Sequence, residues 1–190
     1  MKTVPHDARE TRARRIFAVL GSAVFFIIAP GTVWGLVPWW ITGWRVQAPL
    51  WGFPPLRVLG GLLILAGLFV VLDSFARFAL KGLGTPAPLF PTRHLVVSGF
   101  YRYVRNPIYV AGISVIIGEG LYFGNLRLFG YGALVWLGTH VFVVTYEEPK
   151  LRATFGAEYD AFCAHVPRWL PRLARVLTSD RALPSIRQKR

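Results

Sequence analysis

Four apolar stretches, each long enough or nearly long enough to cross a bilayer, alternate with polar connections along the chain. They cover residues 16–37, 58–80, 108–123 and 126–146. A membrane-spanning helix needs roughly 17 to 25 apolar residues, so the pattern predicts an all-α polytopic membrane protein with about four transmembrane helices. The third stretch is short and carries Glu119 near its end, and we expect a tilted or partly re-entrant helix there.

The segment after the fourth stretch has a different pattern. Pro149 disfavours helical geometry in the residue before it, so we expect the fourth helix to break or kink at Glu148. Apolar side chains then recur every three or four residues, at Leu151, Phe155, Tyr159, Phe162 and Val166. This spacing predicts an amphipathic helix that packs under the membrane domain or lies along the headgroups.

Proline, glycine and tryptophan divide the N-terminal half. Pro30 and Pro38 punctuate the first stretch, and five tryptophans at its exit favour the outer membrane interface: Trp34, Trp39, Trp40, Trp44 and Trp51. The second stretch carries Gly60, Gly61 and Gly67, which permit close contact between helices. It ends with Asp73 and Arg77, an i,i+4 pair that favours the helix, before a Gly/Pro-rich loop over residues 81–91.

The net charge of +13 reflects topology rather than a nucleic-acid partner, which we exclude. The basic residues follow the connections, with five in residues 1–15, two in the first connection, five in residues 77–107, one in the third connection and nine from Lys150 onward. This alternation predicts that both termini lie in the cytoplasm, at the plasma membrane or a bacterial inner membrane. The single cysteine and four histidines lack the spacing of metal ligands.

Two adjacent acids, Glu147 and Glu148, end the fourth stretch in an unfavourable position. They lie at the negative end of a helix dipole, repel each other and have apolar neighbours. Side chains placed against local stability in this way are typical of functional sites. Residues 99–109 supply cations, aromatic rings and a helix start at the same membrane face, so we expect a polar pocket for a zwitterionic ligand beside lipid.

Two strings of residues carry a family resemblance. The first is Ser98-Gly99-x-Tyr101 followed by Arg105-Asn106-Pro107-x-Tyr109; the second is Glu147-Glu148-x-x-Leu151-x-x-x-Phe155-Gly156-x-x-Tyr159-x-x-Phe162-x-x-x-Val166-Pro167-x-x-x-Pro171. Together they resemble the isoprenylcysteine carboxyl methyltransferase and phospholipid methyltransferase superfamily. The resemblance covers residues 82–171, nearly half the chain, and the long second string is its specific part.

The resemblance implies an integral membrane enzyme that uses S-adenosyl-L-methionine and methylates a lipophilic small molecule from the bilayer. One glutamate would hold the cofactor ammonium while the other braces Arg105 or a backbone donor, and we favour Glu147 for the contact. Arg105 would meet the cofactor carboxylate with its planar fork. A ring of Tyr101, Tyr109 or Tyr159 would face the adenine or the sulfonium.

The acceptor stays open among prenylated cysteine carboxylates, phospholipid amines and quinone or hopanoid-type lipids. A carboxylate nucleophile needs a nearby cation such as Arg168 or Arg102, whereas an amine must lose a proton, for which His140 is the candidate. Structural alternatives are a hydrogen-bonded interhelical role for His140 and a headgroup anchor for Arg168. The sequence does not fix the oligomeric state.

Asn106 departs from the superfamily, in which many relatives have histidine. An amide carries no proton at neutral pH, so no titrating group acts there. Asn at the N-cap followed by Pro107 at the first helical position predicts a capping role, with cofactor contact as a further possibility.

We divide the chain into residues 1–80, with two transmembrane helices, and residues 81–190, a methyltransferase-like core, within one membrane domain. Two other functions compete. One is a membrane reductase that takes hydride from NADPH, because sterol reductases resemble this superfamily near their C-termini. The other is a non-catalytic membrane scaffold, which has no reason to bear the cost of the paired glutamates.

Overall fold

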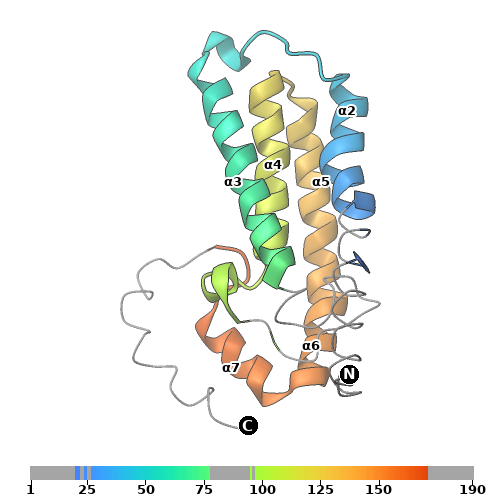
Figure 1. Ribbon diagram of the computed structural model, residues 1–190, viewed down its shortest axis with the longest axis vertical. Coiled ribbons are helices and arrows are strands. Elements are labelled where there is room, and N and C mark those ends of the chain that lie inside the picture. The colour runs from blue at the N-terminus through green and yellow to red at the C-terminus, as the bar shows by residue number, and fades with distance from the viewer. Residues whose placement is uncertain (1–19, 22–23, 25–26, 78–94, 96, 171–190) are drawn as a thin grey trace, which may run out of the picture.

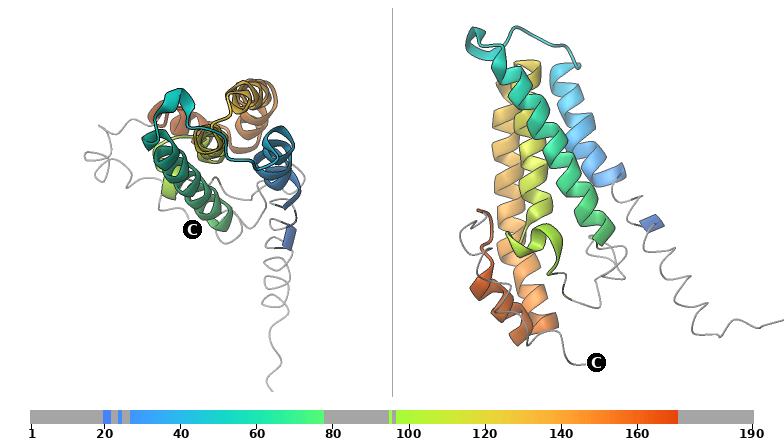
Figure 2. Two further views of the ribbon diagram at one scale, coloured as in Figure 1. Left: turned by 90° about the horizontal axis from the view of Figure 1, so that it is seen from above. Right: turned by 60° about the vertical axis from the view of Figure 1, so that its left-hand side comes forward.

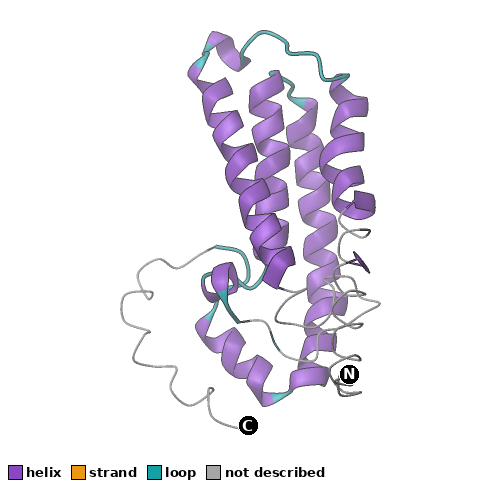
Figure 3. Cartoon of the chain, viewed as in Figure 1, coloured by secondary structure: helices purple, strands orange, loops and turns teal. Residues whose placement is uncertain are grey.

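The computed structural model describes residues 20–21, 24, 27–77, 95 and 97–170. Within these residues the chain forms helices joined by loops and contains no β-strand (Figure 3). The all-α prediction is confirmed for this part. The basic N-terminal residues, the Gly/Pro-rich loop and the C-terminal tail after residue 170 lie outside the described residues.

Four apolar helices run side by side, with α4 between α3 and α5 and with α2 against α4 and α5 (Figures 1 and 2). The first is Ile27–Thr42, which includes the π turn η1 (Thr32–Leu36) and α2 (Val37–Thr42); the others are α3 (Pro55–Arg77), α4 (Pro107–Phe123) and α5 (Arg127–Phe142). Short 3-10 turns, η2 (Leu50–Gly52) and η4 (Gly99–Arg102), precede α3 and α4. The π turn η5 (Val143–Glu147), α6 (Glu148–Phe155) and α7 (Ala157–His165) follow α5.

Two helices have the length and apolar character to cross a membrane, Pro55–Arg77 and Arg127–Phe155. The apolar helices Ile27–Thr42 and Pro107–Phe123 are shorter. Two of the four expected spans are therefore supported by length and composition, and the other two stay a prediction. The bounds of α4 agree with those expected for the third stretch.

The first helix continues past its predicted end near residue 37. Pro38 lacks an N–H, and the preceding π turn absorbs this defect: the Val37 N–H donates to the Thr32 carbonyl, five residues back. Pro38 has no N–H to donate to the Val33 carbonyl. This carbonyl instead accepts a hydrogen bond from the Tyr131 hydroxyl of α5 at 2.9 Å. A contact between helices thus compensates for the proline, and the helix ends at Gly43 with φ of 58°.

The predicted break at Glu148 is wrong. Glu148 is helical, with φ of −63° and ψ of −44°, and the chain passes from α5 through η5 into α6. The π turn η5 comes directly before Pro149, and in it the Glu148 N–H donates to the Val143 carbonyl, five residues back, so the helix continues past the proline. The break falls instead at Gly156, whose φ of 52° and ψ of −127° suit glycine. The single amphipathic helix predicted after Pro149 is therefore two helices, α6 and α7.

Helix α3 packs on α4 through glycines. A Cβ atom on Gly60 would lie 2.5 Å from the Gly118 carbonyl oxygen, and one on Gly67 would lie 2.7 Å from the Ala111 carbonyl oxygen. Gly61 faces a more open region, where the nearest atom would be 3.9 Å away. The predicted close helix contact is confirmed at Gly60 and Gly67, because only glycine permits these approaches.

Candidate active site

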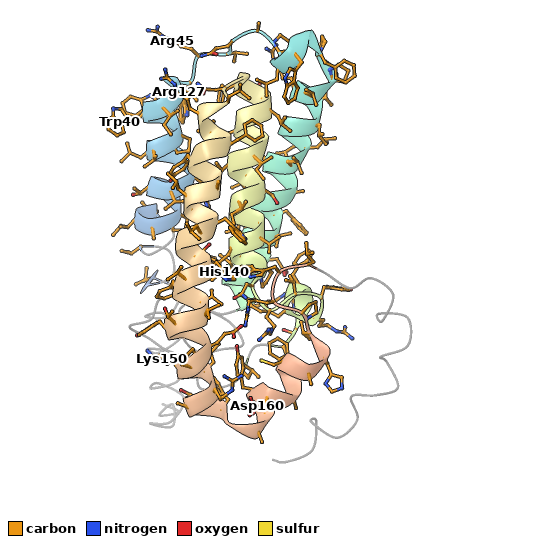
Figure 4. The ribbon with its side chains drawn as sticks, turned by 180° about the vertical axis from the view of Figure 1, so that it is seen from behind. Trp40, Arg45, Arg127, His140, Lys150 and Asp160 are labelled. Atoms are coloured by element: carbon orange, nitrogen blue, oxygen red, sulfur yellow. The ribbon has the colours of Figure 1, made fainter. Side chains whose placement is uncertain are left out.

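Charged and polar side chains from distant parts of the chain meet at the end of the molecule where α6 and α7 lie (Figure 4). The elements that meet are η4, the start of α4, η5, α6 and residues 166–169, which turn back from α7. Lys150 and Asp160 mark this end of the molecule, whereas Trp40, Arg45 and Arg127 lie at the opposite end (Figure 4). The Asp73–Arg77 pair is present on α3 just above, with Arg77 Nε 2.6 Å from Asp73 Oδ2, as the spacing predicted.

Glu148 is the centre of an ion-pair network. Its carboxylate accepts two hydrogen bonds from Arg168, at 2.7 and 2.8 Å, and pairs with Arg105 at 3.0 Å. The side chains of Glu148 and Arg105 are only 9% and 12% exposed, so solvent screens their attraction weakly. The hydrogen bonds to Glu148 raise the pKa of Arg168, which stays charged. The expectation that one glutamate braces Arg105 therefore holds for Glu148.

Glu147 has different partners from its neighbour. The Tyr109 hydroxyl donates to Glu147 Oε2 at 3.0 Å. Within the described residues, no Lys, Arg or His side chain forms an ion pair with Glu147. Burial and the negative charge of Glu147 raise the pKa of Tyr101 well above its usual value, so this phenol also keeps its proton. Glu147 is thus a half-buried carboxylate near two tyrosines, and no cation of the described part of the chain pairs with it.

Arg105 is held by contacts from both sides. Its Nη1 lies 2.8 Å from Cys163 Sγ, and its backbone N–H donates to the Pro167 carbonyl at 2.9 Å. Its Nε is buried and has no hydrogen-bond partner among the described residues. Tyr159 is buried on the same helix as Cys163, and burial raises the pKa of its phenol. Sequence reasoning missed Cys163, although its i+4 spacing from Tyr159 places both on one face of α7.

Asn106 occupies the N-cap position of α4 and Pro107 follows at the first position, as predicted. The Asn106 side chain makes no capping hydrogen bond, however, so the predicted capping role is wrong. Its amide instead donates to the Arg168 carbonyl at 3.2 Å. The side chain is used to join the start of α4 to the segment after α7.

His140 is a hydrogen-bonded residue that joins two parts of the chain. Its Nδ1 accepts from Trp169 Nε1 at 3.1 Å, and its ring stacks on Trp136 at a centroid distance of 5.3 Å. The lone pair on His140 Nδ1, which would take a proton if His140 acted as a base, is therefore occupied by the hydrogen bond from Trp169. Arg168 is likewise bound to Glu148 rather than free to anchor a headgroup, and Arg102 is exposed on η4. Trp169 was not anticipated, although it lies inside the Val166–Pro171 part of the motif.

Residues 56–158 match the family model described as phospholipid methyltransferase, over more than half of the chain. The chain belongs to the phospholipid methyltransferase family. The match includes Arg105, Tyr109, Glu147 and Glu148, and it begins in α3, earlier than the resemblance expected from residue 82. Family membership makes the protein a membrane methyltransferase that acts on lipid. No curated protein matches the chain.

Proposed function

We propose that the protein transfers a methyl group from S-adenosyl-L-methionine to a lipophilic acceptor that reaches the site from the bilayer. The observation that carries this proposal is the unequal pairing of two adjacent glutamates. Glu148 takes both guanidinium groups, whereas no cation of the described residues pairs with Glu147. A half-buried carboxylate of this kind favours a ligand with an ammonium group.

The donor set fits the proposed cofactor. Glu147 would hold the α-ammonium, and Arg105, whose buried Nε lacks a partner among the described residues, would turn toward the α-carboxylate. Tyr101, Tyr109 and Tyr159 would offer ring faces to the adenine or the sulfonium. Asn106 and Pro107 set the start of α4, and so fix where Arg105 and Tyr109 stand. When bound, the cofactor supplies a methyl group activated on a positively charged sulfur.

The task of the chain's own residues is then to align the acceptor and exclude water. No residue needs to form a covalent intermediate, because a direct displacement requires only alignment. The nearly buried ion pair with Glu148 keeps the Arg105 guanidinium at the site, where it would meet the cofactor carboxylate.

The acceptor is either a phospholipid amine or a carboxylate of the isoprenylcysteine type, and the family description favours the amine. Of the two cations considered for a carboxylate, Arg168 is bound to Glu148 by two hydrogen bonds. For an amine, His140 can take a proton at Nδ1 only after Trp169 releases that atom. We place the site at the cytoplasmic face, in accordance with the distribution of basic residues.

Two measurements test the proposal. Calorimetric titration of the detergent-solubilised protein should detect binding of S-adenosylhomocysteine and none of NADPH. Lipid extracts incubated with the protein and a labelled methyl donor should yield one labelled species, whose mass identifies the acceptor. Binding of NADPH without S-adenosylhomocysteine would instead support the reductase and overturn the proposal.

A further inference from the structure

The segment after α7, residues 166–169, forms a strap that is hydrogen-bonded to three separate elements. Its backbone carbonyls at Pro167 and Arg168 accept from the Arg105 N–H and the Asn106 amide, at the start of α4. The Arg168 guanidinium donates twice to Glu148, at the start of α6. Trp169 Nε1 donates to His140 Nδ1, on α5. All of these contacts except the one to His140 involve Arg105, Glu148 or Asn106.

The Arg168–Glu148 pair is not a strong anchor by itself. The Arg168 side chain is 33% exposed, and partly exposed ion pairs are weakened by solvent screening. Trp169 follows Arg168 directly, so the direction of the strap at Arg168 depends on where the indole is held. His140 and Glu148 are eight residues apart on one continuous helix, about 12 Å at 1.5 Å per residue. The strap therefore contacts this helix at two separate positions, which restrict its movement more than either contact would alone.

The indole binds its partner by a directional contact as well as by packing. The His140 ring stacks on Trp136 from one side and lies 5.8 Å from the Trp169 ring on the other. Nδ1 can accept from the indole only if it carries no proton, so the neutral ring must have its proton on Nε2. Trp136 stacks without donating to His140, which makes it a matched control.

We propose that the hydrogen bond from Trp169 to His140 is a latch that positions Arg168 on Glu148, which makes His140 and Trp169 positioning residues for the cofactor site. When the latch is lost, the strap leaves Glu148 for part of the time. Glu148 then has only Arg105 as a partner and draws that guanidinium fully to itself. Arg105 is less available to a cofactor carboxylate, so cofactor binding weakens; this last step rests on the proposed function.

The first readout is independent of methyl transfer. Trypsin cleaves after arginine, and the Arg168–Trp169 bond is protected while the Arg168 guanidinium is held on Glu148. His140→Leu removes the acceptor at similar size, whereas His140→Asn keeps an oxygen at the position of Nδ1. We expect cleavage after Arg168, followed by mass spectrometry, to be roughly three- to tenfold faster in the Leu variant, the factor for one net hydrogen bond. The Asn variant should restore protection.

Trp169→Phe keeps an aromatic ring but removes the donor, and it serves if His140→Leu fails to fold. It should match His140→Leu, and the double variant should be no worse than either single one, because both remove the same bond. Trp136→Phe should be cleaved at the wild-type rate. Unchanged cleavage in both His140→Leu and Trp169→Phe would overturn the latch, as would an Asn variant no better than the Leu variant.

The second readout is calorimetric titration with S-adenosylhomocysteine. We expect the dissociation constant to rise roughly three- to tenfold in His140→Leu and Trp169→Phe and to recover in His140→Asn. Faster cleavage with unchanged affinity would overturn the positioning role. If the wild-type protein binds no S-adenosylhomocysteine, the proposed function fails, and the protease experiment alone decides whether the latch holds Arg168.

Discussion

The interface between α3 and α4 and the polar site below it are held together in opposite ways. In the interface, Gly60 and Gly118 bring two backbones so close that neither position has room for a methyl group. In the site, Glu148 binds the guanidinium groups of Arg105 and Arg168, which come from two distant segments. The interface depends on the absence of side chains, and the site depends on their charges.

The comparison shows why the two regions tolerate change differently. A lipid environment gives little hydrophobic drive for helices to associate, so close packing must supply the stability of the bundle. An ion-pair network gives specificity, but it loses stability when one partner is removed and the other stays buried and charged. We therefore expect the largest effects on folding from the glycines, intermediate effects from Glu148, and effects on binding alone from Glu147.

Gly60→Ala should be the most destabilising of these changes. The new methyl group would meet the Gly118 carbonyl oxygen and the Tyr122 backbone nitrogen, neither of which can turn aside. Overpacking against backbone should cost about 3 kcal/mol, measured by thermal unfolding in detergent with circular dichroism. Gly138→Ala is the matched control, because a Cβ there has no neighbour within 4 Å, and it should leave stability equal or slightly higher. Equal stability of the two variants would contradict the close-packing account.

Glu148→Gln should have the next largest effect. It leaves the nearly buried Arg105 guanidinium without a counter-charge and weakens the hold on Arg168. We expect a loss of about 2 to 3 kcal/mol, less than for a wholly buried pair because Arg168 is partly exposed. Glu147→Gln is the control, since its amide oxygen can still accept from Tyr109. If Glu147→Gln destabilises the protein as much, the two glutamates do not have the separate roles assigned here.

Arg152→Ala should have the smallest effect. Arg152 pairs with Asp160 at 2.8 Å between α6 and α7, but both side chains are more than half exposed. Exposed pairs are screened by water and salt, so we expect the unfolding temperature to stay at the wild-type value. A clear fall in the unfolding temperature would mean that the junction of α6 and α7 relies on charge as much as Glu148 does.

The sequence was sufficient to predict the helical class, the bounds of α4 and the segments that meet at the site. It was insufficient where the backbone hydrogen bond that a proline cannot make is compensated by a distant residue or by a π turn. Pro38 and Pro149 predicted interruptions, yet a π turn before each lets the helix continue, and at Pro38 the Tyr131 hydroxyl completes the repair. Gly156, which does end a helix, lacked a proline to mark it.

The partners within the site were equally hard to predict. Asn106 has the residue type and position of a cap, but its amide bonds to the strap, whose path only the folded chain reveals. The two glutamates are adjacent and chemically identical, so the sequence could not assign Glu148 to the arginines. Trp169 was missed because its partner, His140, lies 29 residues earlier in the chain.

The most direct test of the account measures cofactor binding to a variant of Glu147. S-adenosylhomocysteine titrated into Glu147→Gln should bind at least about tenfold more weakly than into the wild-type protein, because a charge-assisted hydrogen bond is replaced by a neutral one. The unfolding temperature of this variant should be unchanged. Wild-type affinity in Glu147→Gln would contradict the claim that the carboxylate of Glu147 holds the cofactor ammonium.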